Sequence, residues 1–199
     1  MRLVIARNVL IATMLLTVAG CGLWQESFVP TETDQDPARR IPGIQIFDDT
    51  NTTHVPRTER VSYDRIPPTG GPHDVVWAEC TGTVYDIAVR NENMVHSLEH
   101  GAVWITYHPE QVSGEALQAL VRRVQGQPYT MLSPYPDLPV PISLQAWGHQ
   151  LRVDDADDKR IDQFLQALRA NPYTSPEPGS PCEAYPGTFD SADPPAFGS

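Results

Sequence analysis

The sequence predicts a single α+β domain in which a mixed β-sheet is covered by two or three helices. Residues 102–107 form a β-branched and aromatic run, which is typical of a buried strand. Residues 113–125 and 155–171 repeat apolar side chains every three or four positions, as amphipathic helices do. Strand-like and helix-like segments that alternate along the chain favour helices layered on a sheet.

The elements are expected in the order strand, short helix, strand, helix, strand, strand, helix. Gly101 and Gly126 stand where helices would end, and Ser113 is a candidate N-cap. This order also resembles the α/β order of thioredoxin-like proteins, although the sequence has no Cys-x-x-Cys pair. The expected strands are 83–89, 102–107, 129–132 and 142–153, and the expected helices are 91–100, 113–125 and a third from Asp155 or Asp157 to Asn171.

Composition divides the chain into four parts. The first is an apolar leader and the second is rich in acidic residues and proline with few large apolar side chains. The last part holds seven prolines among polar residues, so it has little capacity to form a core of its own. We expect a signal peptide at 1–20, an acidic flexible tether at 21–42, a globular domain at 43–171 and a proline-rich tail at 172–199.

The leader has the features of a bacterial lipoprotein signal. Arg2 and Arg7 precede an apolar stretch at 9–18 that is short for a membrane span. It ends in Leu16-Thr17-Val18-Ala19-Gly20-Cys21, which resembles a lipobox, where the chain is cut before the Cys and the thiol is acylated. The alternatives are an ordinary secretory signal with a chance cysteine, or a retained anchor helix. The lipoprotein interpretation predicts a domain that is tethered by lipid to the outer side of the cytoplasmic membrane.

The charge balance excludes one broad class of partner. The chain has 25 Asp and Glu against 14 Lys and Arg, a formal net charge of -11. Removing the leader with its two arginines leaves 12 basic residues against 25 acidic ones, or -13. Because nucleic-acid affinity depends on cations that meet phosphates, we expect no nucleic-acid partner.

Cysteine usage agrees with an oxidising compartment. With Cys21 assigned to lipid, Cys80 and Cys182 remain as an even pair, and we expect them to form a disulfide that ties the tail to the core. The alternative is a Cys80 thiolate that binds copper beside histidines. A blue-copper site would also need His and Met close to the Cys, and neither stands near Cys182.

The chemistry is concentrated in histidines. His96 and His100 are spaced i and i+4, so on a helix both rings reach a common ion. His54 and His73 lie upstream in loop-like contexts, the second behind a run of proline and glycine. His108 and His149 are expected to be structural residues that are satisfied by hydrogen bonds.

The motifs around these histidines resemble an extracytoplasmic bacterial family catalogued as Domain of Unknown Function family 3105. The resemblance covers about residues 45–170 and adds His54-Val55 and Tyr63 to the pattern; Gly71 stands where Ser is more usual. It implies that His54, His73, His96 and His100 form a set, and family members often occur in genomic company with copper-handling proteins. The motifs are Pro67-Pro68-Thr69-Gly70-Gly71-Pro72-His73, His96-Ser97-Leu98-Glu99-His100-Gly101 and Ala146-Trp147-Gly148.

We therefore expect a metal-binding protein for storage, delivery or scavenging, with copper preferred over zinc. Met94 and Met131 favour copper because its reduced form prefers thioether sulfur, although each is also a plausible core residue. Three roles are open for Glu99: it could orient a metal ligand by a hydrogen bond without binding the ion itself, cap the helix, or face solvent.

Two other functions stay open at this point. His96-x-x-Glu99-His100 fits the His-x-x-Glu-His pattern of inverzincin peptidases, in which Glu99 would be the general base of a zinc-dependent hydrolase. The acidic third ligand of such an enzyme would have to come from Glu177 or Glu183 in the proline-rich tail. The remaining alternative is a non-catalytic cell-surface module with structural histidines that binds an extracytoplasmic protein. No catalytic residue is assigned outside the hydrolase alternative.

Overall fold

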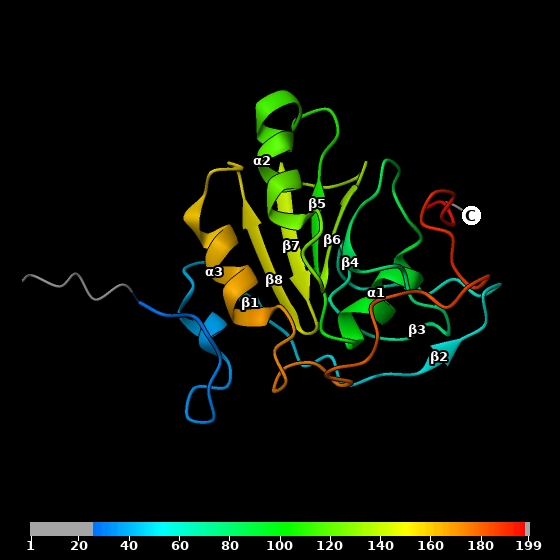
Figure 1. Cartoon of the computed structure of the whole chain (residues 1–199), viewed down its shortest axis with the longest axis horizontal. Coiled ribbons are helices and arrows are strands. Elements are labelled where there is room, and N and C mark those ends of the chain that lie inside the picture. The colour runs from blue at the N-terminus through cyan, green and yellow to red at the C-terminus, as the bar shows by residue number, and fades with distance from the viewer. Residues whose placement is uncertain (1–25, 198–199) are drawn as a thin grey trace, which may run out of the picture.

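The computed structural model describes residues 26–197, which form one α+β domain (Figure 1). The signal peptide and the lipidation site at Cys21 lie outside the described residues. No helix among residues 26–197 has the length and apolar character needed to cross a membrane.

A 3-10 helix, η1 (Pro37–Arg40), opens the described chain, followed by β1 (Gln45–Ile46), β2 (His54–Val55), β3 (His73–Asp74), β4 (Thr81–Val84), α1 (Asn91–Glu99), β5 (Val103–Tyr107), α2 (Gly114–Val124), β6 (Thr130–Pro134), β7 (Ile142–Ala146), β8 (His149–Val153) and α3 (Lys159–Leu168).

A mixed six-stranded sheet organises the domain. Its strand order is β1-β8-β7-β5-β6-β4, with β4, β6 and β5 parallel and β7, β8 and β1 joined by antiparallel pairing. A separate two-stranded sheet pairs β2 with β3 in parallel. The expected α+β class with a mixed sheet is thus confirmed, and three α-helices are described.

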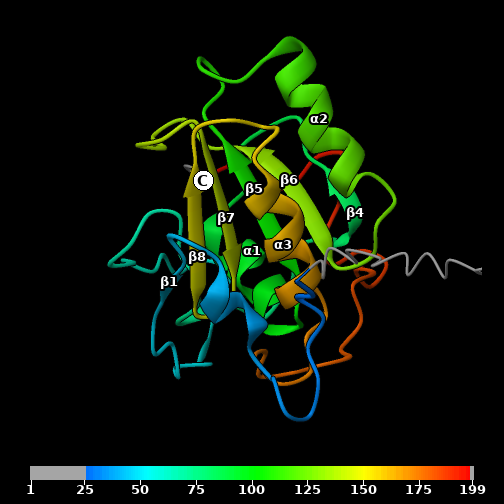
Figure 2. The same cartoon turned by 90° about the vertical axis from the view of Figure 1, so that its left-hand side faces the viewer.

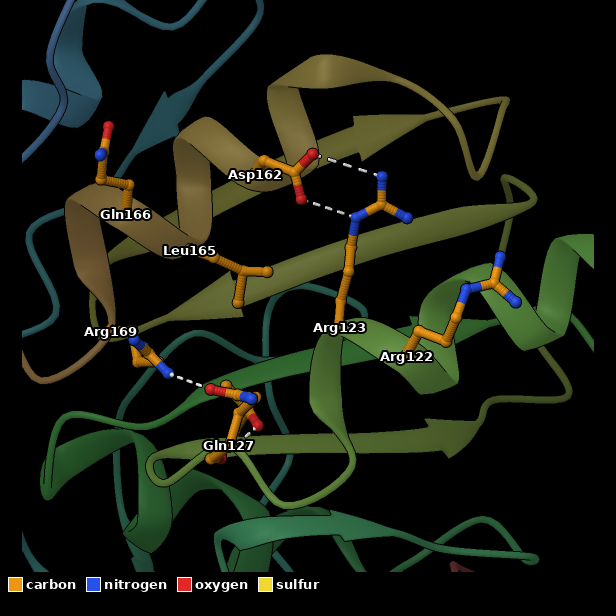
Figure 3. Close-up of a pocket in the computed structure, with 8 residues that line it drawn as sticks. Arg122, Arg123, Gln127, Asp162, Leu165, Gln166 and Arg169 are labelled. Carbon is orange, nitrogen blue, oxygen red and sulfur yellow. Dashed lines mark hydrogen bonds and ion pairs between the residues drawn. The ribbon is translucent and has the colours of Figure 1, made fainter.

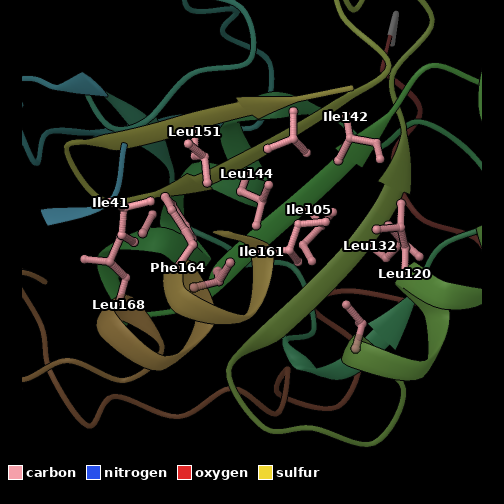
Figure 4. Close-up of a cluster of buried hydrophobic side chains, with 14 of the residues drawn as sticks. Ile41, Ile105, Leu120, Leu132, Ile142, Leu144, Leu151, Ile161, Phe164 and Leu168 are labelled. Atoms are coloured by element: carbon pink, nitrogen blue, oxygen red, sulfur yellow. The ribbon is translucent and has the colours of Figure 1, made fainter. Parts of the chain in front are cut away.

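The two faces of the sheet carry different helices. Along β5, Val103 and Ile105 join the cluster that packs under α2 and α3, whereas Trp104 between them joins the cluster that contains α1. This alternation follows from the two-residue period of a strand. Figure 2 shows α2 and α3 in front of the sheet, and Figure 4 shows how Leu144 and Ile105 meet Phe164 and neighbouring side chains.

Two expected strands differ from the observed ones. Residues 142–153 form a hairpin rather than one strand, because Trp147-Gly148 turns the chain and Gly148 adopts φ 68°. The strand expected at 83–89 is observed at Thr81–Val84, where the ladder shifts register between Thr81 and Thr83. The remaining expected helices and strands agree with the structure to within a few residues at their ends.

The described part of the expected flexible tether is packed onto the domain. Phe28, Ala38 and Ile41 are buried in the main core, and the backbone N–H of Phe28 donates to the Gln166 side chain on α3. Ile41 contacts the same core as the helix residues labelled in Figure 4. The structure corrects this expectation because three small or apolar side chains, too few to stand out in composition, are placed over the apolar face of α3.

The tail is tied down by the expected disulfide. Cys80 and Cys182 are bonded, which joins positions 102 residues apart in the sequence. The backbone N–H of Cys80 also donates to the carbonyl of Cys182, and Val89 forms an isolated bridge with Ala196. The proline-rich tail therefore runs along the domain as part of its second hydrophobic cluster.

Candidate metal centre

Three of the four expected histidines come together at one edge of the domain. His54 on β2 is the register partner of His73 on β3, so the parallel pairing sets the two residues side by side. His96 lies on α1, which packs against β3. The centroids of the three imidazole rings are 4.8–4.9 Å apart in every pair.

The proline- and glycine-rich run before His73 forms a fixed loop. Gly71 has φ 106°, a conformation that side chains other than glycine rarely adopt. A Cβ on Gly70 would come within 2.7 Å of the Asp49 Cβ, so this position has no room for a side chain. Tyr63 donates its hydroxyl to the Pro72 carbonyl at 2.7 Å. These contacts explain why position 70 is a glycine, and they place the His73 ring.

Helix α1 brings a carboxylate to the histidines as well as an imidazole. His96 and Glu99 are three residues apart, so both side chains lie on the face of α1 that meets β3. The side chains of Asn93 and Ser97 donate to the backbone carbonyls of Val76 and Ala78 and hold the helix on this segment. Glu99 is almost completely buried, which is rare for an ionisable side chain.

The four side chains have the spacing of a metal site. One ligand atom from each of His54, His73, His96 and Glu99 lies within 4.8 Å of all the others. Glu99 Oε2 is 2.9 Å from His73 Nε2, 3.8 Å from His54 Nε2 and 3.9 Å from His96 Nε2. An ion bound to all four would face three nitrogen donors and one oxygen donor.

Hydrogen bonds on the far side of two rings determine which nitrogen faces the cluster. His73 Nδ1 lies 2.9 Å from the Gly71 carbonyl, and His96 Nδ1 lies 2.6 Å from the Asp74 carbonyl. Because a carbonyl oxygen only accepts, Nδ1 carries a proton in both rings, and Nε2 is the nitrogen that faces the cluster. Metal-binding histidines are commonly oriented in this way.

Two buried atoms in the cluster lack a hydrogen bond. His73 Nε2 and Glu99 Oε2 have no hydrogen-bond partner among the described residues, although they lie 2.9 Å apart. When the His73 ring carries its proton on Nδ1 alone, both atoms are acceptors, and two buried acceptors that face one another are destabilising. A cation between them would remove this cost.

Burial also keeps His96 in the form that binds metal. Desolvation lowers the pKa of His96 to about 3, and the neighbouring histidines contribute in the same direction against the hydrogen bond to Asp74. Its imidazole is therefore neutral at neutral pH. Desolvation likewise lowers the pKa of His100, against the hydrogen bond to Pro181 and the charge of Glu177.

The structure places His100 outside the four-residue group. Its Nδ1 lies 2.9 Å from the Pro181 carbonyl in the tail, and its Nε2 lies 3.7 Å from Glu177 Oε2. The ring still touches the His96 ring, with centroids 4.7 Å apart. The tail position fixed by the disulfide turns His100 toward the tail, and Glu99 takes the place that the i, i+4 spacing had suggested for His100.

The methionines and the remaining histidines lie elsewhere. Met94 and Met131 are fully buried in the second hydrophobic cluster. His149 is held between the Trp147 carbonyl and Asp36, and the Nδ1 of His108 accepts from the Glu110 backbone. The donor set that the structure assembles therefore contains no thioether.

Aromatic side chains form two walls that sequence patterns did not reveal. Trp147 from the β7–β8 turn meets His73 edge to face at 6.0 Å, and its indole N–H donates to the Asp49 carbonyl. Trp77 contacts His96 at 5.4 Å and His100 at 4.9 Å. The Ala-Trp-Gly motif contains Trp147 and could have indicated that this residue lies at the site. No sequence motif pointed to Trp77.

A separate pocket of about 390 Å³ lies between α2 and α3 (Figure 3). Two of its three arginines are engaged with neighbours: Arg123 pairs with Asp162, and Arg169 donates to Gln127. None of the four cluster residues lines it. We therefore assign the chemistry to the histidine cluster.

Comparison with curated proteins finds no match, and comparison with solved structures finds none either. A family model does match, and it covers residues 54–184, which include the whole histidine cluster and the disulfide. That family is described as a protein of unknown function. The chain belongs to the DUF3105 family.

Proposed function

We propose that this protein binds one divalent transition-metal ion through His54, His73, His96 and Glu99. The observation that carries the proposal is the pair of buried atoms, His73 Nε2 and Glu99 Oε2, that face one another without a hydrogen bond. Imidazole and carboxylate are common ligands of such ions, and four of them suffice for a tetrahedral site.

Copper in its divalent state and zinc are the ions that suit these ligands. Three imidazoles and a carboxylate are borderline to hard donors. Along the series of divalent first-row transition metals, the affinity of such sites is highest for Cu²⁺ and lower for Zn²⁺. With Met94 in the hydrophobic core, the cluster lacks the soft donor that would favour Cu⁺. We propose that Cu²⁺ is the ion bound more tightly, and that the protein serves in metal storage, delivery or scavenging.

We further propose that the domain is tethered by lipid at Cys21 on the outer side of the cytoplasmic membrane. The lipobox-like residues before Cys21 support this location, and so does the Cys80–Cys182 disulfide, because such bonds persist in oxidising compartments. A Cys21→Ser variant is expected to lose incorporation of labelled fatty acid and to keep its uncleaved leader. Equal fatty-acid labelling of the variant would contradict the anchor.

The metal proposal is tested by metal content after incubation with Cu²⁺ or Zn²⁺ and gel filtration. Wild type is expected to retain one ion per chain, and His73→Ala and His96→Ala to retain none. His108→Ala is the matched control, because that histidine lies outside the cluster. A wild type free of metal, while circular dichroism shows it folded, would refute the proposal.

A His100→Ala variant separates this site from the hydrolase alternative. The peptidase pattern uses both histidines of His-x-x-Glu-His as ligands, so loss of His100 would abolish metal binding. The cluster described above excludes His100, and we expect the variant to keep its ion. Metal loss in folded His100→Ala would favour the peptidase pattern.

A further inference from the structure

We infer that His54 is the exchangeable ligand of the cluster, and that the ion enters and leaves by displacement of its imidazole. The inference rests on the proposed metal site and specifies its use: transfer of the ion to another ligand set, rather than permanent binding. The inference rests on three differences between His54 and the other ligands: His54 is more exposed, its ring has no hydrogen bond to a described residue, and its backbone makes fewer packing contacts.

Burial separates one ligand from three. The His54 side chain is 44% exposed, whereas those of His73, His96 and Glu99 are between 0% and 5% exposed. An incoming donor atom from solvent or from another protein therefore meets His54 first. Replacing any of the other three would require movement of β3, α1 or the walls formed by Trp147 and Trp77.

Hydrogen bonding separates the ligands in the same way. His73 and His96 are each anchored through Nδ1 to a backbone carbonyl. The His54 ring has no hydrogen bond to a described residue, and its contacts are the neighbouring rings and the 3.8 Å approach to Glu99. Rotation of the His54 side chain thus breaks its bond to the ion and the 3.8 Å approach to Glu99, but no hydrogen bond to a described residue.

The backbone that carries His54 is itself lightly held. β2 has two residues and pairs only with β3, with the Thr53 carbonyl accepting from the His73 N–H. Between 48 and 66, Val55 is the only buried residue. By contrast, β3 packs against α1, and α1 contributes Met94, Val95 and Leu98 to the second cluster.

The exchange needs no redox step. A nitrogen or sulfur donor of the receiving ligand set forms a bond to the ion as the bond to His54 Nε2 breaks, and the imidazole leaves with its lone pair. His73, His96 and Glu99 hold the ion through this substitution, so it is not released free into solution. A three-ligand site with an open fourth position is a stable arrangement for zinc.

The test compares transfer of Zn²⁺ or Cu²⁺ from loaded protein to an excess of a chromophoric chelator by stopped flow. His54→Ala is expected to retain one ion per chain at reduced affinity and to transfer it at least about tenfold faster than wild type. Added imidazole should occupy the open position and slow the transfer again. His108→Ala should match wild type.

His73→Ala and His96→Ala provide the contrast, because both are expected to lose the ion altogether. The inference is overturned if folded His54→Ala loses the ion as completely as these two variants do. It is equally overturned if the transfer rate of His54→Ala equals that of wild type. It is also overturned if imidazole has no effect on the faster transfer. A wild type that binds no ion would instead refute the proposed function itself.

Discussion

Glu99 shows how a single residue's role depends on its surroundings. In the sequence it stands between two histidines, and its carboxylate could orient a ligand, act as a base or face solvent. In the structure it is buried among three imidazoles, with no hydrogen bond for Oε2 among the described residues. A carboxylate buried among imidazoles that carry no charge is costly, and a bound cation would compensate it.

A Glu99→Gln variant should therefore change binding and stability in opposite directions. We expect metal affinity to fall by at least about 10- to 100-fold, since the negative charge and a strong donor are lost. We expect the metal-free variant to be no less stable than metal-free wild type, because a neutral amide costs less to bury than a carboxylate whose Oε2 has no hydrogen bond to a described residue. Chelator competition and denaturant unfolding measure the two effects.

Glu177→Gln is the matched control, because Glu177 faces His100 rather than the cluster. Its metal affinity should equal that of wild type. Undiminished affinity in Glu99→Gln would show that the carboxylate is not a ligand.

At the scale of elements, α3 illustrates a boundary with a clear physical cause. The helix begins at Lys159 because the Asp158 side chain accepts from the Arg160 backbone N–H. The hydrogen bond from the Arg160 side chain, together with that backbone bond and nearby positive charge, lowers the pKa of Asp158 against the effect of burial. The sequence suggested Asp155 or Asp157, because each of these acidic residues is an equally good cap by type.

Replacing Asp158 tests this cap. Asp158→Ala should lower the free energy of unfolding by about 0.5–2 kcal/mol, whereas Asp158→Asn keeps a capping oxygen and loses less. Since the pKa of Asp158 is lowered on folding, its charge stabilises the protein above the unfolded pKa of about 3.9 and ceases to do so as pH falls through the folded value. Chemical unfolding measured against pH should thus show wild type and Asp158→Asn converging in acid; a constant gap would contradict this origin.

Gly82 explains why β4 is offset from the strand that its alternating residues predict. It has φ 90°, and a Cβ there would lie 2.3 Å from the Gln127 nitrogen and 2.5 Å from the Gly126 nitrogen. The register shift of β4 occurs between Thr81 and Thr83, on either side of it. The end of α2 can therefore approach β4 only because this position lacks a side chain.

Gly82→Ala should destabilise the protein much more than Gly126→Ala. Both residues have positive φ, which costs about 1–2 kcal/mol for alanine, but a Cβ on Gly126 meets no atom within 4 Å. We expect Gly82→Ala to add a backbone clash to this cost and to lose more than about 2 kcal/mol in thermal or denaturant unfolding. Equal losses in the two variants would show that the contact is relieved cheaply.

At the scale of the whole molecule, the ends of the described chain complete the domain. Residues 26–41 cover the apolar face of α3, and the tail covers the second cluster beside α1. The disulfide joins that tail to the segment before β4, and Pro181 next to it accepts from His100. Stability thus depends on segments whose own composition predicts little structure.

Removing the disulfide should separate stability from metal binding. The double variant Cys80→Ala/Cys182→Ala is expected to lose about 2–5 kcal/mol of unfolding free energy, because a long loop in the unfolded chain is no longer closed. It should still bind one ion when folded, since neither cysteine nor the tail supplies a ligand. Loss of metal from the folded variant would show that the tail positions the cluster.

The sequence by itself determined the α+β class, the main helices, the cysteine pair and three of the four cluster residues by motif. It could do so because periodicity, helix ends and residue chemistry are local properties. Only the tertiary structure decided that β2 pairs with β3 in register, that Glu99 enters the group and that His100 turns to the tail. These outcomes depend on contacts between segments far apart in the chain, such as Pro181 with His100 and α1 with β3, which no local pattern of residues specifies.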